Sequence, residues 1–247
     1  EATSRRLQVE KGDIDIAWEL FPDQVKALQS SSELHIDKFP ATTIYYVGMN
    51  VTKGPLKNAK VRQAIRYAVD YDGIINHVMG GAAKAINTFI PEGFAGYNPK
   101  IHFTQDIAKA KALMAEAGFP NGFETTINTG DQTPNPELSQ VLQASLAKIG
   151  IKLKINKMIS SQLWPDYRKQ NHDIIMARWG PDYNDPHTNA QPFADHTVKQ
   201  LSWRNAYYND TTAGLIDQAS REMDQAKRMA LYNKANDIIQ QNGPYIF

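Results

Sequence analysis

The segment 178–187, with the sequence RWGPDYNDPH, brings together more chemically useful side chains than any other ten residues of the chain. It follows residues 172–177, whose alternating and β-branched side chains are typical of a strand that runs into a core. Because prolines and an asparagine interrupt the segment, we expect Trp179, Asp182 and Tyr183 to lie on a loop at the end of that strand.

In an open α/β sheet, ligands bind outside the carboxyl ends of the strands. An indole, a carboxylate and a phenol there would provide an apolar wall, a fixed negative charge and a hydrogen-bonding rim. The candidate ligand-binding residues are Trp179, Gly180, Asp182, Tyr183 and Asn184. In an alternative interpretation the aromatic side chains only close the core and the aspartates only shape turns. The loop by itself does not decide between the two.

The composition excludes several classes of protein. The chain has 247 residues, enough for one large domain or two small ones, with 42% hydrophobic and 21% charged residues. These values are typical of an ordinary globular protein. A net charge of +1 gives no basic field for nucleic acid. Because the chain has no cysteine, disulfides, thiolate metal sites and cysteine nucleophiles are excluded.

A metal site near the loop is a weaker hypothesis. Carboxylates and imidazoles suit several divalent ions, and the candidate ligands would be Asp182, Asp185, His187, Asp195 and His196. Prolines and polar turn residues separate them, however, and no pair of ligands is spaced i, i+4 on a helix. We therefore predict no metal and no cofactor.

Enzyme motifs give little support for catalysis. The sequence contains neither of the common glycine-rich phosphate loops nor a nucleophile-elbow serine. A hydrolase that uses two carboxylates stays open as an alternative, because sequence alone cannot show which carboxylates face each other.

Helical and strand-like segments alternate along most of the chain, which predicts the α/β class. Helices are expected at residues 7–11, 22–28, 61–69, 70–81, 106–118, 136–149, 160–169, 212–221 and 225–240. Strands are expected at residues 14–18, 34–39, 44–49, 123–128, 151–155 and 172–177. The helix between Ile127 and Ile151 has the length of a crossover between parallel strands. In the helix 61–69 we expect Arg62 and Arg66 on the solvent side.

Several of these segments form a wider pattern. It consists of GDIDIA at 12–17, MN at 49–50, VRQAIRYAVD at 61–70, IP at 90–91, KAKALMAEAG at 109–118, LAKIGI at 146–151 and the aromatic loop with its two aspartates. In this order and spacing the segments resemble the solute-binding proteins of the peptide, dipeptide and nickel uptake family of bacterial ABC importers, known as family 5. The resemblance runs from about Arg5 to Phe247.

The resemblance implies a periplasmic-binding-protein-like lobe of type II, with a mixed sheet flanked by helices. Family members are about twice this length and have two lobes that close on the ligand. We therefore expect residues 1–247 to form a single ligand-binding lobe, a fragment from which the first lobe is absent. Residues 244–246 look like the start of a strand that returns to that lobe.

The resemblance also implies roles for the loop. In peptide binders of the family, the aspartate at the position of Asp182 pairs with the α-ammonium group of the ligand, and the tryptophan at the position of Trp179 lines the cleft. Dipeptide-specific relatives also hold the ligand carboxylate with an arginine just before an Asn-Pro. Here that segment is DQTPNP at 131–136, without an arginine. Longer peptides, opine-like compounds and other amines remain open as ligands.

The function implied is that of a non-catalytic receptor in the periplasm. Its expected partners are a peptide or other amine-bearing solute, an inner-membrane ABC permease and the missing first lobe, with no nucleic acid. Alternatives are a carboxylate-using hydrolase, a solute-binding protein for an opine or a metal chelate, and a purely structural role. Composition alone fits the cytosol almost as well as the periplasm.

Overall fold

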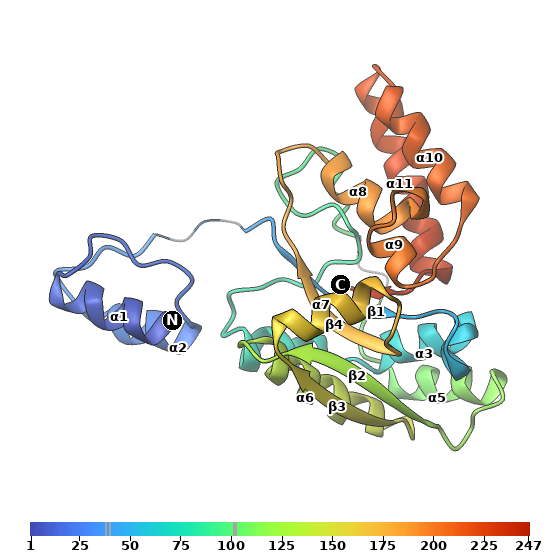
Figure 1. Ribbon diagram of the computed structural model, residues 1–247, viewed down its shortest axis with the longest axis horizontal. Helices are drawn as coiled ribbons and strands as arrows, with labels where there is room; N and C mark the ends of the chain where they lie inside the picture. The colour runs from blue at the N-terminus through green and yellow to red at the C-terminus, as the bar shows by residue number, and fades with distance from the viewer. Residues whose placement is uncertain (38, 40, 101–102) are drawn as a thin grey trace.

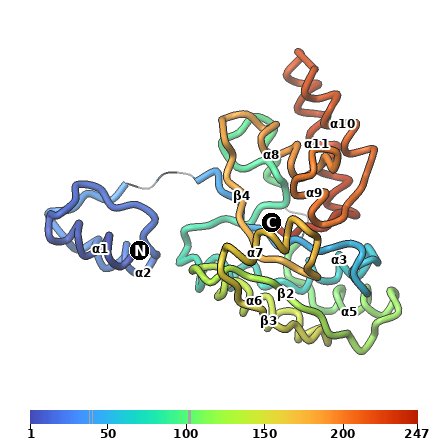
Figure 2. The backbone as a smooth tube through the Cα atoms, in the orientation of Figure 1, coloured from blue at the N-terminus to red at the C-terminus, as the bar shows by residue number. Residues whose placement is uncertain are grey.

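The computed structural model describes residues 1–37, 39, 41–100 and 103–247. Figures 1 and 2 show a small helical segment at the N-terminus that stands to one side of a larger α/β body. The strands of the body are β1 (Ile44–Met49), β2 (Glu124–Gly130), β3 (Lys152–Met158), β4 (Ile174–Trp179) and β5 (Tyr245–Ile246). They confirm the strands predicted near 44–49, 123–128, 151–155 and 172–177.

These strands form one mixed sheet in the order β3-β2-β4-β1-β5. Strand β2 pairs in parallel with both β3 and β4, while β1 is antiparallel to β4 and to β5. Helix α6 (Asn135–Ala147) connects β2 to β3 and is the predicted crossover. The mixed sheet flanked by helices confirms the predicted fold class.

Two helical layers cover the two faces of the sheet (Figure 1). One face carries α3 (Ala59–Ala68), α5 (Ile107–Glu116) and α6. The other carries α7 (Ser160–Arg168), α8 (His187–Ala194), α9 (Leu201–Arg204), α10 (Asp210–Arg221) and α11 (Gln225–Asn242). Side chains from alternate strand positions enter the two cores: Ile175 and Ala177 face α7–α11, whereas Ile174 and Met176 face α3, α5 and α6.

Shorter helical segments complete the body. They are η1 (Gly54–Lys57), α4 (Tyr71–Gly73), η2 (Ile74–Val78) and η3 (His196–Val198). The helix predicted from residue 70 is thus confirmed between Tyr71 and Val78, first as α4 and then as a wider helical turn. No helix in the described residues is both long and apolar enough to span a membrane.

Helix α3 corrects one prediction. Arg62 and Arg66 are not on the solvent side, because they are 5% and 1% exposed. The Arg66 guanidinium donates hydrogen bonds to the carbonyl oxygens of Gln240 (2.7 Å), Gly243 (2.6 Å) and Tyr245 (2.8 Å). The amphipathic pattern located the helix correctly, but it could not show that a second helix ends against its polar face and offers unpaired carbonyls. Burial lowers the pKa of Arg66 to about 10.

The N-terminal segment contains α1 (Ala2–Lys11) and α2 (Pro22–Leu28), as predicted. Helix α1 ends at Gly12, whose φ of 74° is in the left-handed region that favours glycine. The strand predicted at 14–18 is wrong: this stretch has no partner strand in the described residues, and Trp18 is 73% exposed. The Arg5 guanidinium binds the carbonyl oxygen of Trp18 instead, at 2.9 Å.

The strand predicted at 34–39 is also wrong for the residues that the structure describes. Residues 34–37 and 39 form no strand, and Lys38 lies outside the described residues. The alternation of apolar side chains there has no sheet edge beside it, so the backbone gains no ladder of hydrogen bonds.

Candidate ligand-binding site

The aromatic loop, defined here as residues 180–186, joins the end of β4 to the start of α8. Trp179 does not lie on it, contrary to our prediction, but is the last residue of β4 and stands opposite Ile44 of β1. Its ring packs edge-on against Phe193 of α8, with the ring centroids 6.5 Å apart. Its indole Nε1 is buried and has no hydrogen-bond partner in the described residues. Trp179 thus packs against the core at the end of the strand.

The three polar candidates of the loop are exposed to solvent: Asp182, Tyr183 and Asn184. The backbone N–H of Asp182 donates to Thr188 Oγ1 at 3.2 Å, which fixes the start of the loop on α8. In the described ranges (1–37, 39, 41–100 and 103–247), no hydrogen bond or ion pair engages the Asp182 carboxylate. This carboxylate is therefore a negative charge that a ligand can reach and that no side chain neutralises.

Gly180 is the fifth candidate. A Cβ atom built there would lie 3.7 Å from Thr43 Oγ1, an ordinary van der Waals distance, and φ at this position is not in the left-handed region. The local packing does not require a glycine, so the role predicted for Gly180 depends on the ligand alone.

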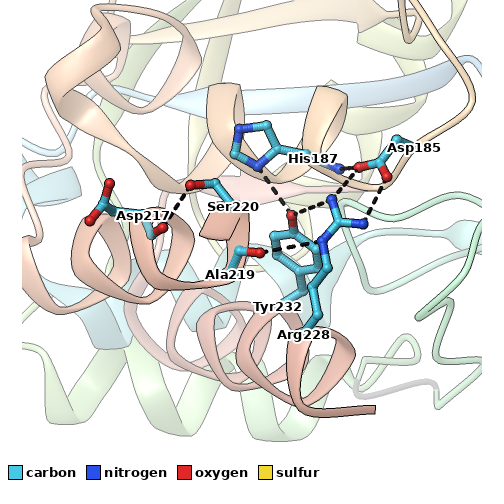
Figure 3. A network of polar contacts seen from close by, with 7 residues as sticks. All are labelled: Asp185, His187, Asp217, Ala219, Ser220, Arg228 and Tyr232. Atoms are coloured by element: carbon cyan, nitrogen blue, oxygen red, sulfur yellow. Dashed lines mark hydrogen bonds and ion pairs between the residues drawn. The ribbon is translucent and has the colours of Figure 1, made fainter. Parts of the chain in front are cut away.

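The loop is fixed at its other end by Asp185. The Asp185 carboxylate accepts two hydrogen bonds from Arg228 of α11, at 2.8 Å from Nη1 and 2.7 Å from Nη2 (Figure 3). It also accepts the backbone N–H of His187 at 2.8 Å, in the first turn of α8. The hydrogen bond from Arg228 is the main reason why the pKa of Asp185 is lowered, so the pair is ionised at neutral pH.

Arg228 is itself held by further contacts. Its Nε donates to the carbonyl oxygen of Ala219 in α10 at 3.3 Å, and its Nη2 donates to the Tyr232 hydroxyl at 3.1 Å. The same hydroxyl lies 3.1 Å from His187 Nδ1 (Figure 3). Burial lowers the pKa of His187, which favours a neutral ring at this hydroxyl. The network thus joins the loop to α8, α10 and α11.

Sequence reasoning did not find Arg228 or Tyr232. Both are on a helix more than 40 residues beyond the loop, and a single arginine in a helix is a weak signal (Asp185 to Arg228 spans 43 residues). The available hint was Asp185 itself, because an aspartate just before a proline that opens a helix commonly caps the helix.

The segment after β2 lies at the same edge of the sheet as the loop. Strands β2 and β4 are parallel neighbours, so their carboxyl ends point the same way. Residues 131–134 carry one carboxylate, that of Asp131, and no cation. The Thr133 hydroxyl donates to Glu137 Oε1 at 3.1 Å, in the first turn of α6. No side chain of this segment supplies a positive charge for a ligand carboxylate.

The hypothetical metal ligands are separated by the fold. Asp185 pairs with Arg228, and Asp195 accepts the backbone N–H of Thr197 at 2.8 Å as a helix cap. His196 lies 3.5 Å from Asp210. In the part of the chain that the structure describes, no group of three or more histidine, aspartate or glutamate side chains is arranged to hold a metal ion.

The fold is that of known periplasmic binding proteins. The ABC transporter-associated periplasmic binding protein DppA from Helicobacter pylori, solved in complex with the peptide STSA, superposes with a TM-score of 0.91 at 30% identity. The match covers 100% of this chain and 49% of that protein. The chain therefore has the architecture of one part of a solute-binding protein.

The sequence comparisons name the family. The model of the bacterial extracellular solute-binding proteins, family 5, middle region, matches residues 1–200. The chain belongs to this family. It is 31% identical over 250 residues to a probable D,D-dipeptide-binding periplasmic protein of Escherichia coli K12, covering 100% of this chain and 48% of that protein. It is 30% identical over 258 residues to heme-binding protein A of Haemophilus influenzae, covering 100% of this chain and 46% of that protein.

The chain thus spans about half the length of the relatives it matches. The names of these relatives refer to different ligands, a dipeptide and a heme. Membership of the family consequently does not specify the solute.

Proposed function

We propose that this chain is the ligand-binding part of a substrate-binding component of an ABC importer, and that it takes peptides or similar amine-bearing solutes. The observation that carries the proposal is the exposed Asp182 carboxylate, which has no partner in the described residues and stands on a loop fixed by Asp185 and Arg228. A ligand ammonium placed against it makes charge-assisted hydrogen bonds, and exclusion of water strengthens them.

The aromatic side chains beside it support the same assignment. We assign Trp179 and Tyr183 to the walls of the site. Gly180 contributes its backbone, and Asn184 lies at the rim. The indole of Trp179 packs at the end of β4 beside Phe193, and its buried N–H has no partner in the described residues. One relative is named for a D,D-dipeptide and another was solved with the peptide STSA, so a peptide is the first candidate to test.

We propose further that residues 1–247 form one lobe of a two-lobe protein. The support is the share of the relatives covered, 48% and 49% in the two peptide-related matches. The first lobe would close over the aromatic loop, and an inner-membrane permease would receive the solute from the closed protein. We place this in the periplasm because the named relatives are periplasmic proteins. The family consists of binding proteins, so we propose no catalytic step.

The segment after β2 narrows the class of ligand. Residues 131–134 carry no arginine or lysine. The carboxylate of a short zwitterionic peptide therefore has no positively charged side chain to bind in this segment. We therefore favour solutes that are recognised through an ammonium group and whose carboxylate lies elsewhere, such as longer peptides.

Replacing Asp182 with asparagine in the two-lobe protein tests the proposal. The change keeps the shape and removes the charge, and loss of a desolvated charge pair costs about 2–5 kcal/mol, or roughly thirtyfold or more in affinity. Calorimetric titration with tetrapeptides should show this loss, while the melting temperature stays unchanged because the side chain is exposed. Asp217→Asn, at an exposed carboxylate of α10, is the matched control and should bind normally.

Two results would contradict the proposal. Unchanged affinity in Asp182→Asn would remove Asp182 from the site. Release of cleavage products from a peptide mixture, in place of stoichiometric capture, would favour the alternative of a carboxylate-using hydrolase.

The single-lobe proposal has its own test. Residues 1–247 alone lack the closure that buries a ligand between two lobes, and should bind the same peptide much more weakly than the two-lobe protein. Tight, saturable one-to-one binding by this chain alone would contradict it.

A further inference from the structure

The aromatic loop depends on very few side-chain contacts with the rest of the molecule. Its start is tied to α8 through Asp182 N and Thr188 Oγ1, and its interior hydrogen bond joins Asp185 N to the Tyr183 carbonyl oxygen at 2.9 Å. Among the described residues, the link from this loop to the α10–α11 pair runs through the Asp185 carboxylate and Arg228. In the described part of the chain, one ion pair therefore links the loop to this pair of helices, while its other contacts are with α8.

Several contacts restrict the movement of this ion pair. Both carboxylate oxygens are engaged, which fixes the orientation of Asp185 as well as its distance. The guanidinium is in turn oriented by Ala219 O and Tyr232 OH, so it cannot follow the loop without losing its own partners (Figure 3). The Arg228 side chain is 15% exposed and the Asp185 side chain 32%, so the pair is partly shielded from water.

The fixed point lies close to the proposed ligand contact. Asp185 is three residues after Asp182, so the two Cα atoms are at most about 10 Å apart. A displacement of Asp185 is transmitted to Asp182 through the exposed residues between them, because the one further side-chain contact there among the described residues is that of Thr188 Oγ1 with the Asp182 backbone N–H. Displacements of about 1 Å are enough to weaken a charge-assisted contact markedly.

We infer that Arg228 is a positioning residue for ligand recognition: through Asp185 it sets the conformation of residues 180–186 that presents the Asp182 carboxylate to a ligand ammonium. Arg228 does not touch the ligand in this proposal, and its effect on affinity is transmitted through Asp185. The inference rests on the proposed function for its link to binding, whereas its structural half, the fixing of the loop, stands apart from any ligand.

Arginine is specifically required for this role. A lysine at 228 keeps the positive charge but offers one ammonium group in place of a planar fork, so it cannot fix both carboxylate oxygens and bind Ala219 O together. Arg228→Lys should therefore behave as an intermediate case between the native protein and Arg228→Gln.

The loop can be tested without a ligand, because the chain contains no cysteine and accepts two labelled ones cleanly. Spin labels on Asn184→Cys in the loop and Lys154→Cys in β3 report one interresidue distance by pulsed electron resonance. Both positions are exposed. We expect a narrow distance distribution in the native background, a broadened one in Arg228→Gln and Asp185→Asn, and an intermediate width in Arg228→Lys.

Arg221→Gln is the matched control for this measurement. Arg221 pairs with Asp217 at 2.6 Å on the same pair of helices, but that pair is exposed and does not involve the loop. It should leave the distribution unchanged. An unchanged distribution in both Arg228→Gln and Asp185→Asn would overturn the inference, even if the proposed function holds.

The second measurement asks whether the effect passes through Asp182. In the two-lobe protein, with the tetrapeptide STSA and its N-acetylated form as probes, Arg228→Gln should weaken binding of the free peptide about tenfold. The same substitution should cause no further loss in the Asp182→Asn background, and little loss for the acetylated peptide. An equal loss in both backgrounds would overturn the inference, because a general structural defect acts regardless of Asp182.

The two measurements separate the possible failures. If the native protein captures neither STSA nor other tetrapeptides from a mixture, the proposed function fails while the distance distributions still decide how the loop is held. If peptides bind but the losses of affinity from Arg228→Gln and Asp182→Asn are additive, the proposed function survives and the positioning role of Arg228 is rejected.

Discussion

The two ends of helix α11 are both held by arginines, yet in opposite ways. Near its N-terminus, Arg228 of the helix itself donates to the partly exposed carboxylate of Asp185. At its C-terminus, the buried side chains of Arg62 and Arg66 of α3 donate to backbone carbonyls instead. The chemical consequence is visible in the pKa values: the Asp185 hydrogen bond raises that of Arg228, whereas burial lowers that of Arg66 to about 10.

The two arginines bind different kinds of acceptor: Arg66 binds backbone carbonyls, whereas Arg228 binds one side chain. The carbonyls bound by Arg66 belong to the backbone, where the last turn of any helix leaves such acceptors unpaired. Arg66 therefore fixes the position of a helix end, whatever side chains that end carries. The pair of Asp185 and Arg228 joins two particular side chains, so it can hold one particular loop.

The largest effect is expected from Arg66→Met. Methionine fills much of the volume but leaves the carbonyl oxygens of Gln240 and Tyr245 buried without this donor. We expect a loss of about 3–5 kcal/mol in the free energy of unfolding, measured by urea denaturation. A loss below about 1 kcal/mol would show that water replaces the guanidinium, and that water can reach the C-terminal end of α11.

A smaller effect is expected from Arg228→Met. The pair is partly exposed, so its loss should lower the free energy of unfolding by about 1–2 kcal/mol in the same urea experiment. A loss as large as that of Arg66→Met would contradict the distinction between the two ends, since it would make Arg228 a part of the scaffold.

The stability of Asp185→Asn should depend on pH differently from that of the native protein. Because the pKa of Asp185 is lowered in the folded protein, its stabilising effect is complete above the unfolded value of about 3.9 and is lost as the pH falls through the folded pKa. The native protein should therefore be more stable than the variant at pH 7, and this advantage should shrink towards pH 3.

Melting temperatures of both proteins across this range measure the difference. The buried His172, whose pKa is lowered to about 4 by desolvation, destabilises both proteins alike as the pH falls from about 6.5. Its contribution cancels in the comparison. A constant difference between the two proteins at all pH values would show that the Asp185 charge is not what stabilises the loop.

The smallest effect is expected from Arg221→Met. This arginine pairs with Asp217 four residues earlier on the surface of α10, with both side chains more than half exposed. Such pairs contribute within about 0.5 kcal/mol. A clear destabilisation here would mean that the surface of the α10–α11 pair is more tightly coupled than the contacts imply.

Local patterns predicted most of the sheet and its helices. Alternation and the content of β-branched and aromatic residues located strands of this sheet, and the glycines at 12 and 118 marked helix ends correctly. The amphipathic pattern of residues 61–69 located α3, but the exposure of Arg62 and Arg66 was predicted wrongly because their partners come from the far end of the sequence. A polar side chain can be predicted to face solvent only where no polar group inside the protein is available to bind it.

The positions of the candidate site residues were predicted in part. The strand end and the exposed Asp182 follow from strand and turn signals, whereas Trp179 stayed in β4 because β1 begins directly opposite it. Helix α8 was not predicted, since Pro186 and Pro192 lie at its start and within it. The use of Asp185 as an ion-pair partner could not be seen either, because Arg228 is brought to it only by the packing of α11.

The C-terminal strand also bears on how the protein is made. Arg66 donates to the Tyr245 carbonyl oxygen across 179 residues of sequence, and β5 completes the sheet beside β1. At roughly 5–20 residues per second, the ribosome adds those residues in about 9–36 s. Until then the edge of β1 that β5 covers has no partner strand, and the α3 guanidiniums lack these carbonyl acceptors. An unpaired strand edge of this kind is a template for wrong pairing with another chain.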